Sequence, residues 1–290
     1  MLTFPVSTTT EKQEEKLRMR LLKNVLDFYI NSSVHVALAV TSFSFITTLH
    51  FGIPVNWPLL GFIFFGSVLG YNLVKYAGIE NRQHRTRTRL KFIWIFTFLS
   101  LLFFLFFIFS LREESLWWTV FIGTFTVLDG LPLFSKIRNL RNISGIKIFI
   151  IAFVWAGVTT ILPIVEAALA INQDVMIEFV ERFLFVLVLI LPFEIRDLKY
   201  DLEKLGTIPQ RVGVTNTKIL GFTFLVLVVL LEFFKVGNSL ASLGSVTIIS
   251  VLTAVLVWKA RENQARYFAS FWVEGIPVLW LLVLLSLRCM

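Results

Sequence analysis

The chain has 290 residues, of which 57% are hydrophobic and 16% charged, and its mean hydropathy is +0.80. Soluble proteins carry about 25% charged residues, so this composition excludes a water-soluble globular protein. Cys289 is the single cysteine, which excludes a disulfide framework, a cysteine zinc cluster and a CxxC redox site. The net charge is +8, but in so apolar a chain its placement along the sequence is more informative than its sum, and we expect no nucleic-acid partner.

Apolar stretches long enough to cross a bilayer recur along the chain. A membrane span needs about 20 mostly apolar residues, and these spans must be helices because an open sheet leaves backbone groups unpaired in lipid. The sixth span is the weakest, since its uncharged core is short and also fits a buried helix that stops before one interface. The sequence predicts an all-α polytopic membrane bundle of about nine transmembrane helices, at residues 25–48, 56–77, 92–111, 116–135, 147–170, 178–198, 217–234, 238–258 and 267–287.

The basic residues segregate to one side of these spans. Of the 27 Lys and Arg residues, 23 fall on that side, and the other side keeps Arg112, Arg182, Lys235 and Arg288. Because Lys and Arg concentrate in cytoplasmic loops, we predict an integral inner (cytoplasmic) membrane protein with a cytoplasmic N-terminus and its C-terminus on the opposite side. We divide the chain into a polar cytoplasmic tail, 1–23, and a single transmembrane helical domain, 24–290.

An acidic cluster lies at the predicted cytoplasmic end of the sixth span, in LPFEIRDLKYDLEKLGTIPQRVG. Glu194, Asp197 and Asp201 are spaced i, i+3 and i+7, so they share one helical face. Carboxylates this close repel one another unless a cation joins them, and Mg²⁺ takes oxygen ligands together with phosphate or water. The alternative is a helix end neutralised by its own basic neighbours three and four residues away.

This segment resembles the second aspartate-rich motif of UbiA-type membrane prenyltransferases. That motif reads approximately NDxxDxxxD, followed by a basic, glycine-bearing run that ends in Arg-x-Gly. Phe193 takes the position of the asparagine. The matching residues are Glu194, Asp197 and Asp201, followed in the expected order by Lys204, Gly206, Arg211 and Gly213.

The first motif of the same family falls on GYNLVKYAGIE, at the end of the second span. Asn72 matches, Leu73 and Tyr76 replace acids, and Glu80 remains at the last acidic position. In the family the two motifs hold Mg²⁺ on the diphosphate of an isoprenoid donor. Lys75 offers a compact point charge that contacts phosphate directly in place of a missing cation.

The resemblance implies a prenyltransferase that uses Mg²⁺ to transfer a prenyl group from a polyprenyl diphosphate to a lipophilic acceptor among membrane lipids. The eroded first motif leaves open a catalytically impaired protein of the same fold that binds an isoprenoid or another lipid without turnover. A transporter is a third reading, although the sequence lacks an evident inverted repeat. The implied residues are Asp197 and Asp201 for catalysis; Glu194, Asp197, Asp201 and Glu80 for the metal; and Asn72, Lys75, Lys204 and Arg211 for the substrate.

Further carboxylates lie inside predicted spans, where ionised groups are costly and need a partner or a function. For Glu166 and Glu274 the sequence allows either a hydrogen bond between helices or a place in the lining of a cavity. Glu232, near the outer end of the seventh span, is predicted to reach that interface with Lys235.

Overall fold

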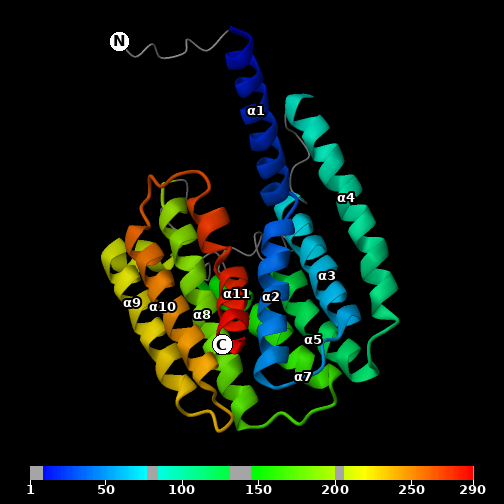
Figure 1. Cartoon of the computed structure of the whole chain (residues 1–290), viewed down its shortest axis with the longest axis vertical. Coiled ribbons are helices and arrows are strands. Elements are labelled where there is room, and N and C mark those ends of the chain that lie inside the picture. The colour runs from blue at the N-terminus through cyan, green and yellow to red at the C-terminus, as the bar shows by residue number, and fades with distance from the viewer. Residues whose placement is uncertain (1–8, 77–83, 131–144, 200–205, 290) are drawn as a thin grey trace.

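The computed structural model is a bundle of helices (Figure 1), and it describes residues 9–76, 84–130, 145–199 and 206–289. The described residues contain no strand, which confirms the predicted all-α class. The site residues Glu80, Asp201 and Lys204 lie outside the described residues. The helices are α1 (Thr9–Asn31), α2 (Val34–His50), α3 (Trp57–Tyr76), α4 (His84–Ile108), α5 (Glu113–Gly130), α6 (Lys147–Ala156), η3 (Gly157–Ile161), α7 (Leu162–Glu166), α8 (Gln173–Asp197), α9 (Ile208–Glu232), α10 (Leu240–Lys259), η4 (Phe268–Val273) and α11 (Ile276–Arg288).

The described helices support a membrane protein, although they do not confirm nine spans. Six of them are long and apolar enough to cross a membrane, or up to seven if a bent pair counts as one span. In that count α6, η3 and α7 form one continuous span, and η4 and α11 form another. Helices α5 and α8 are not among the six candidate spans, because both carry charged residues within their sequences.

The first predicted span, 25–48, is broken rather than continuous. The helices α1 and α2 meet at an angle of 55°, and Ser33 between them has a left-handed backbone with φ of 62°. The polar α1 projects from one end of the bundle, while the apolar α2 lies within it (Figure 1). The break exposes backbone carbonyls at the end of α1 to side chains of other helices.

The helices pack in a closed circuit that includes α2 and α8. Helix α2 packs against α3 and α11, α11 packs against α10, and α8 packs against α10, α9 and α6. Contacts of η3 with both α6 and α2 complete the circuit. Helix α4 packs on α3 and presents Phe98 and Phe106 outward, and Phe109, just beyond its end, is exposed as well. An outward apolar face of this kind suits contact with lipid tails.

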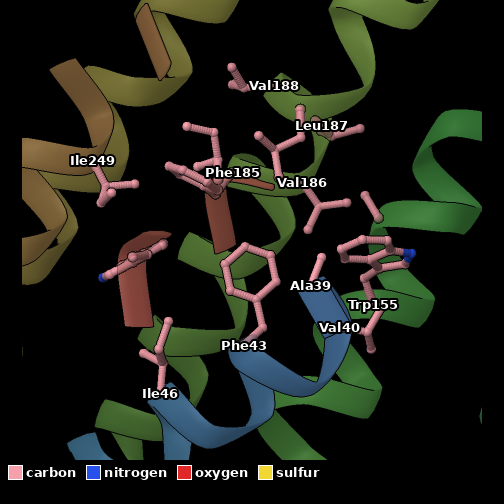
Figure 2. Packing of buried hydrophobic residues seen from close by; sticks show 14 of the residues in the cluster. Ala39, Val40, Phe43, Ile46, Trp155, Phe185, Val186, Leu187, Val188 and Ile249 are labelled. Atoms are coloured by element: carbon pink, nitrogen blue, oxygen red, sulfur yellow. The ribbon is translucent and has the colours of Figure 1, made fainter. Parts of the chain in front are cut away.

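Aromatic side chains fill the middle of the bundle (Figure 2). The ring of Phe43 on α2 makes edge-to-face contacts with Phe185, Trp155 and Trp280, at centroid distances of 6.0, 6.1 and 5.8 Å. These contacts bury large apolar areas and add specific ring–ring attraction. Phe43 and Phe185 lie near the middle of their helices. The polar clusters described below lie on either side of this aromatic layer, toward the two ends of the bundle.

Candidate functional site

The end of α8 carries the acidic residues of the predicted site. Pro192 stands inside the helix and removes one backbone hydrogen bond just before them. Glu194 and Asp197 are both half-buried, and their spacing of three residues places them on one helical face. The guanidinium of Arg196 holds Asp197 through two hydrogen bonds, from Nε at 2.7 Å and from Nη2 at 3.0 Å.

Two glycines with a left-handed backbone, one before α9 and one within its first turns, shape the chain around Arg211. Gly206 has a left-handed backbone with φ of +66°, and its N–H donates to Oε1 of Gln210 at 2.7 Å. The guanidinium of Arg211 lies against Gly206, so that a Cβ added there would stand 3.0 Å from Nη2. Gly213, with φ of 80°, interrupts the helical backbone. The run therefore fixes where Arg211 is presented, at the start of α9 and against Gly206.

At the end of α3, Asn72 ties three helices together. Its Oδ1 accepts a hydrogen bond from the Ser33 hydroxyl at 2.7 Å. Its amide nitrogen donates to the carbonyl oxygen of Ser32 at 3.1 Å and to the hydroxyl of Thr97 at 2.8 Å. The buried amide thus holds the α1–α2 break against α3 and α4, while its predicted contact with substrate stays a prediction.

Lys75 lies one turn beyond Asn72. Its ammonium group donates to the carbonyl oxygen of Asn31 at 3.4 Å, and the same oxygen accepts a hydrogen bond from the Tyr76 hydroxyl at 2.7 Å. The Lys75 side chain is accessible to solvent although protein atoms surround most of it. A charged group in such a place can be reached by a dissolved anion.

The start of the last span brings Glu274 to the same region. Its carboxyl group interacts electrostatically with Lys75 on α3 and with Arg196 on α8. These two helices carry the two sequence motifs, so the structure brings the basic residues of both motifs into range of one carboxylate. The sequence alone did not relate Glu274 to either motif.

The donor set at this end of the bundle suits a hard divalent cation. Glu194 and Asp197 are half-buried carboxylates, and Glu274 adds another within range of Arg196. Oxygen ligands of this kind fit Mg²⁺, which also takes ligands from phosphate and water. The sequence adds Asp201 and Glu80, both outside the described residues.

A second charged cluster lies at the opposite end of α8. Ligand oxygens of three buried glutamates, Glu178, Glu181 and Glu232, lie within 4.8 Å of one another. The ammonium group of Lys235 forms ion pairs with all three, at 2.6 Å from Glu178 and 2.6 Å from Glu232. The cluster therefore already contains its cation, and Glu232 meets Lys235 inside the protein, while the predicted position of the two residues at the membrane interface stays a prediction.

Two further side chains, those of Arg182 and His50, complete this cluster, whose other members are Glu178, Glu181, Glu232 and Lys235. Arg182 donates to Glu178 at 2.5 Å and lies over the ring of Phe43 at 4.2 Å. His50 Nδ1 contacts the second oxygen of Glu178 at 3.0 Å. Burial alone lowers the pKa of Lys235, but the three carboxylates raise it well above its ordinary value. The sequence analysis missed this cluster, although charged residues at i, i+3 and i+4 in the weak sixth span were a signal for it.

Glu166 and Glu274, for which the sequence allowed two different roles, differ in their surroundings. Glu166 accepts hydrogen bonds from the Asn56 side chain at 3.3 Å and from the backbone N–H of Arg112 at 3.1 Å. It therefore joins neighbouring segments, as the first of the two readings predicts. The carboxylate of Glu274 makes no hydrogen bond, and no ion pair within 4.0 Å, to the part of the chain that the structure describes.

Comparison with known proteins supports the fold. The chain resembles the solved structure of a digeranylgeranylglyceryl phosphate synthase, a UbiA-type membrane prenyltransferase. The TM-score is 0.53 at 14% sequence identity, and the match covers 91% of this chain and 97% of the other. No protein-family model matches the sequence, and no curated protein matches it. At this identity the likeness concerns the fold, which extends over nearly the whole chain.

Proposed function

We propose that this chain, which has the fold of a UbiA-type membrane prenyltransferase, transfers a prenyl group from a polyprenyl diphosphate to a lipophilic acceptor. The observation that carries the proposal is that the C-terminal ends of α3 and α8, where the motif residues stand, lie toward the same end of the bundle (Figure 1). There α8 presents Glu194 and Asp197, and α3 presents Lys75. The electrostatic interaction of Glu274 with Lys75 and Arg196 supports the view that the two helix ends form one site.

In the proposed site the acidic residues hold Mg²⁺ and the basic residues hold the diphosphate. The metal ligands are Glu194, Asp197 and Asp201, with Glu80 from the first motif. Bound Mg²⁺ neutralises charge on the leaving diphosphate. Lys75, Lys204 and Arg211 contact its outer oxygens, and Asn72 keeps the end of α3 in place for them.

The reaction breaks the bond between the first carbon of the prenyl chain and the diphosphate oxygen. The acceptor forms a new bond to that carbon and loses a proton, and pyrophosphate leaves. Developing positive charge on the allylic carbon is stabilised by aromatic faces. Fixed charges that match the charge of the transition state supply most of the catalysis.

The orientation of the site follows from the predicted topology. The distribution of basic residues predicts that the acidic end of α8 faces the cytoplasm, where a water-soluble diphosphate headgroup has access. The prenyl chain then lies in the apolar bundle or the surrounding lipid. The solved relative is a synthase of digeranylgeranylglyceryl phosphate, so a glycerol-based lipid phosphate belongs among the acceptors to be tried.

A direct test is incubation of the purified protein with radiolabelled prenyl diphosphates, Mg²⁺ and a membrane lipid extract. The proposal expects a new labelled lipid with the full chain and none with Asp197→Ala that is folded in detergent. Tight binding of the diphosphate without any labelled product would favour the alternative, an isoprenoid-binding protein without turnover, which the acid replacements at Leu73 and Tyr76 suggest.

A further inference from the structure

Glu274 is the intramembrane carboxylate whose role the proposed reaction does not yet explain. It is half-buried at the junction of η4 and α11. Within the described ranges its carboxylate has no hydrogen-bond partner and no ion pair within 4.0 Å. An ionisable group inside a membrane bundle is costly unless it serves a site, so the absence of a structural partner points to a ligand.

The backbone around Glu274 is held by other residues. The ring of His35 donates from Nε2 to the carbonyl oxygen of Phe271 at 2.9 Å, and its Nδ1 accepts from the Tyr29 hydroxyl at 2.8 Å. The same ring packs against Gly275, where an added Cβ would stand 3.3 Å from it. Glu274 therefore lies between two anchored positions, and its own side chain is not needed to keep the segment in place.

The electrostatic neighbours of Glu274 define its surroundings. Lys75 and Arg196 are the cations that act on it, and they come from the helices that carry the two motifs. The pair of cations favours binding of a diphosphate at this place. A carboxylate beside a bound diphosphate repels it, however, unless a cation lies between the two anions.

We infer that Glu274 is a ligand of the Mg²⁺–diphosphate complex and supplies, from the last span, a carboxylate that the first motif on α3 lacks. This inference rests on the proposed function. It accounts for a carboxylate left without a partner in a site that binds phosphate. It also explains how α3 can carry Leu73 and Tyr76 at acidic positions of the motif.

The test uses the full chain in detergent, with inorganic pyrophosphate as the probe and the melting temperature as the readout. At fixed pyrophosphate, free Mg²⁺ is titrated for the parent protein, Glu274→Gln and Glu166→Gln. Glu166 is the matched control, because it is also an intramembrane glutamate but has hydrogen-bond partners elsewhere.

We expect Glu274→Gln to raise the free Mg²⁺ needed for half-maximal stabilisation by about tenfold, a change of about 1.4 kcal/mol. Without Mg²⁺, pyrophosphate should stabilise Glu274→Gln at least as much as it stabilises the parent protein, because the variant lacks a negative charge that repels pyrophosphate. Glu166→Gln should leave the Mg²⁺ midpoint unchanged.

An unchanged midpoint in Glu274→Gln, with a raised midpoint in Asp197→Asn, overturns this inference and leaves the proposed function intact. Unchanged midpoints in both variants overturn the proposed function as well. If Glu274→Gln does not fold, Glu274→Asp decides the matter: its shorter side chain should raise the midpoint, and an unchanged midpoint overturns the inference.

Discussion

The ammonium nitrogen of Lys235 lies 2.6 Å from a carboxylate oxygen of Glu178, although 57 residues separate them in the sequence. This contact joins α8 to the connection between α9 and α10. Both groups are buried, as are Glu181 and Glu232, which pair with the same ammonium group. Because the cation comes from the protein, this acidic cluster serves the packing of the bundle and is separate from the proposed reaction.

Lys235→Met is predicted to destabilise the protein strongly. It leaves three buried carboxylates with too few cations, and removing one partner from a buried ion pair costs about 3–5 kcal/mol. Because the fold raises its pKa, Lys235 is charged in both the folded and the unfolded chain at any pH below the ordinary lysine pKa, so its own ionisation should add no pH dependence to the stability between about pH 6 and pH 9. The melting temperature in detergent, measured across that range, checks both statements.

The control for this change is Lys259→Met, which removes an exposed lysine at the end of α10. It should leave the melting temperature nearly unchanged. The double variant Lys235→Met/Glu181→Gln should recover part of the loss, because it also removes one of the uncompensated negative charges. Equal melting temperatures for Lys235→Met and Lys259→Met would contradict the assigned role of the cluster.

Asn72→Ala is predicted to loosen the packing of α3 against α4 and against the break between α1 and α2. The change removes three hydrogen bonds and leaves the Ser33 hydroxyl unpaired, for a cost of about 2–3 kcal/mol. Asn216→Ala is the control, because Asn216 is exposed and bonds only within its own helix. Denaturant unfolding in detergent measures both, and a loss in Asn216→Ala as large as that in Asn72→Ala would refute the prediction.

Gly206→Ala is predicted to weaken binding of the diphosphate while the protein stays folded. The new Cβ would crowd the guanidinium of Arg211, and the left-handed backbone adds a strain of about 1 kcal/mol. Gly52 has a similar φ of +61° but nothing within 4 Å of an added Cβ. Gly52→Ala therefore reports the strain alone. We expect KM for the prenyl diphosphate to rise several-fold in Gly206→Ala and to stay constant in Gly52→Ala; equal KM values would disprove the placement of Arg211.

Lys75→Met is predicted to weaken binding of a non-hydrolysable prenyl diphosphate analogue by about tenfold, or about 1.4 kcal/mol. The change removes a solvent-accessible cation near Glu274 and Arg196. Lys91→Met, which removes an exposed lysine from α4, should leave the dissociation constant unchanged. A dissociation constant for Lys75→Met that equals the parent value would exclude Lys75 from the phosphate site.

Much of the architecture follows from hydropathy, because apolar stretches of sufficient length form helices in lipid. The break between α1 and α2 could not be predicted in the same way. The sequence around Ser33 reads as a continuation of the helix, and the bend depends on hydrogen bonds with Asn72, which lies 39 residues further along. The charged start of α8 depends in a similar way on Lys235, a distant residue that compensates its glutamates.

At the candidate site the local spacing of Glu194 and Asp197 was enough to predict that they share a helical face. The arrangement of Arg211 beside Gly206 explains why the motif carries a glycine there. The position of Glu274 depends instead on the contact of η4 with α2, through Phe271 and His35. No periodicity within one helix encodes that contact.

If the end of α8 that carries Glu194 and Asp197 binds and cleaves a prenyl diphosphate, the protein must release pyrophosphate, and the rate of that release can be measured. Purified protein receives a labelled prenyl diphosphate and an acceptor lipid extract, with Mg²⁺ or with EDTA. We expect one pyrophosphate to be released for each labelled lipid, with both products lost in EDTA and in folded Asp197→Ala. Undiminished product in Asp197→Ala, or in EDTA, would contradict it.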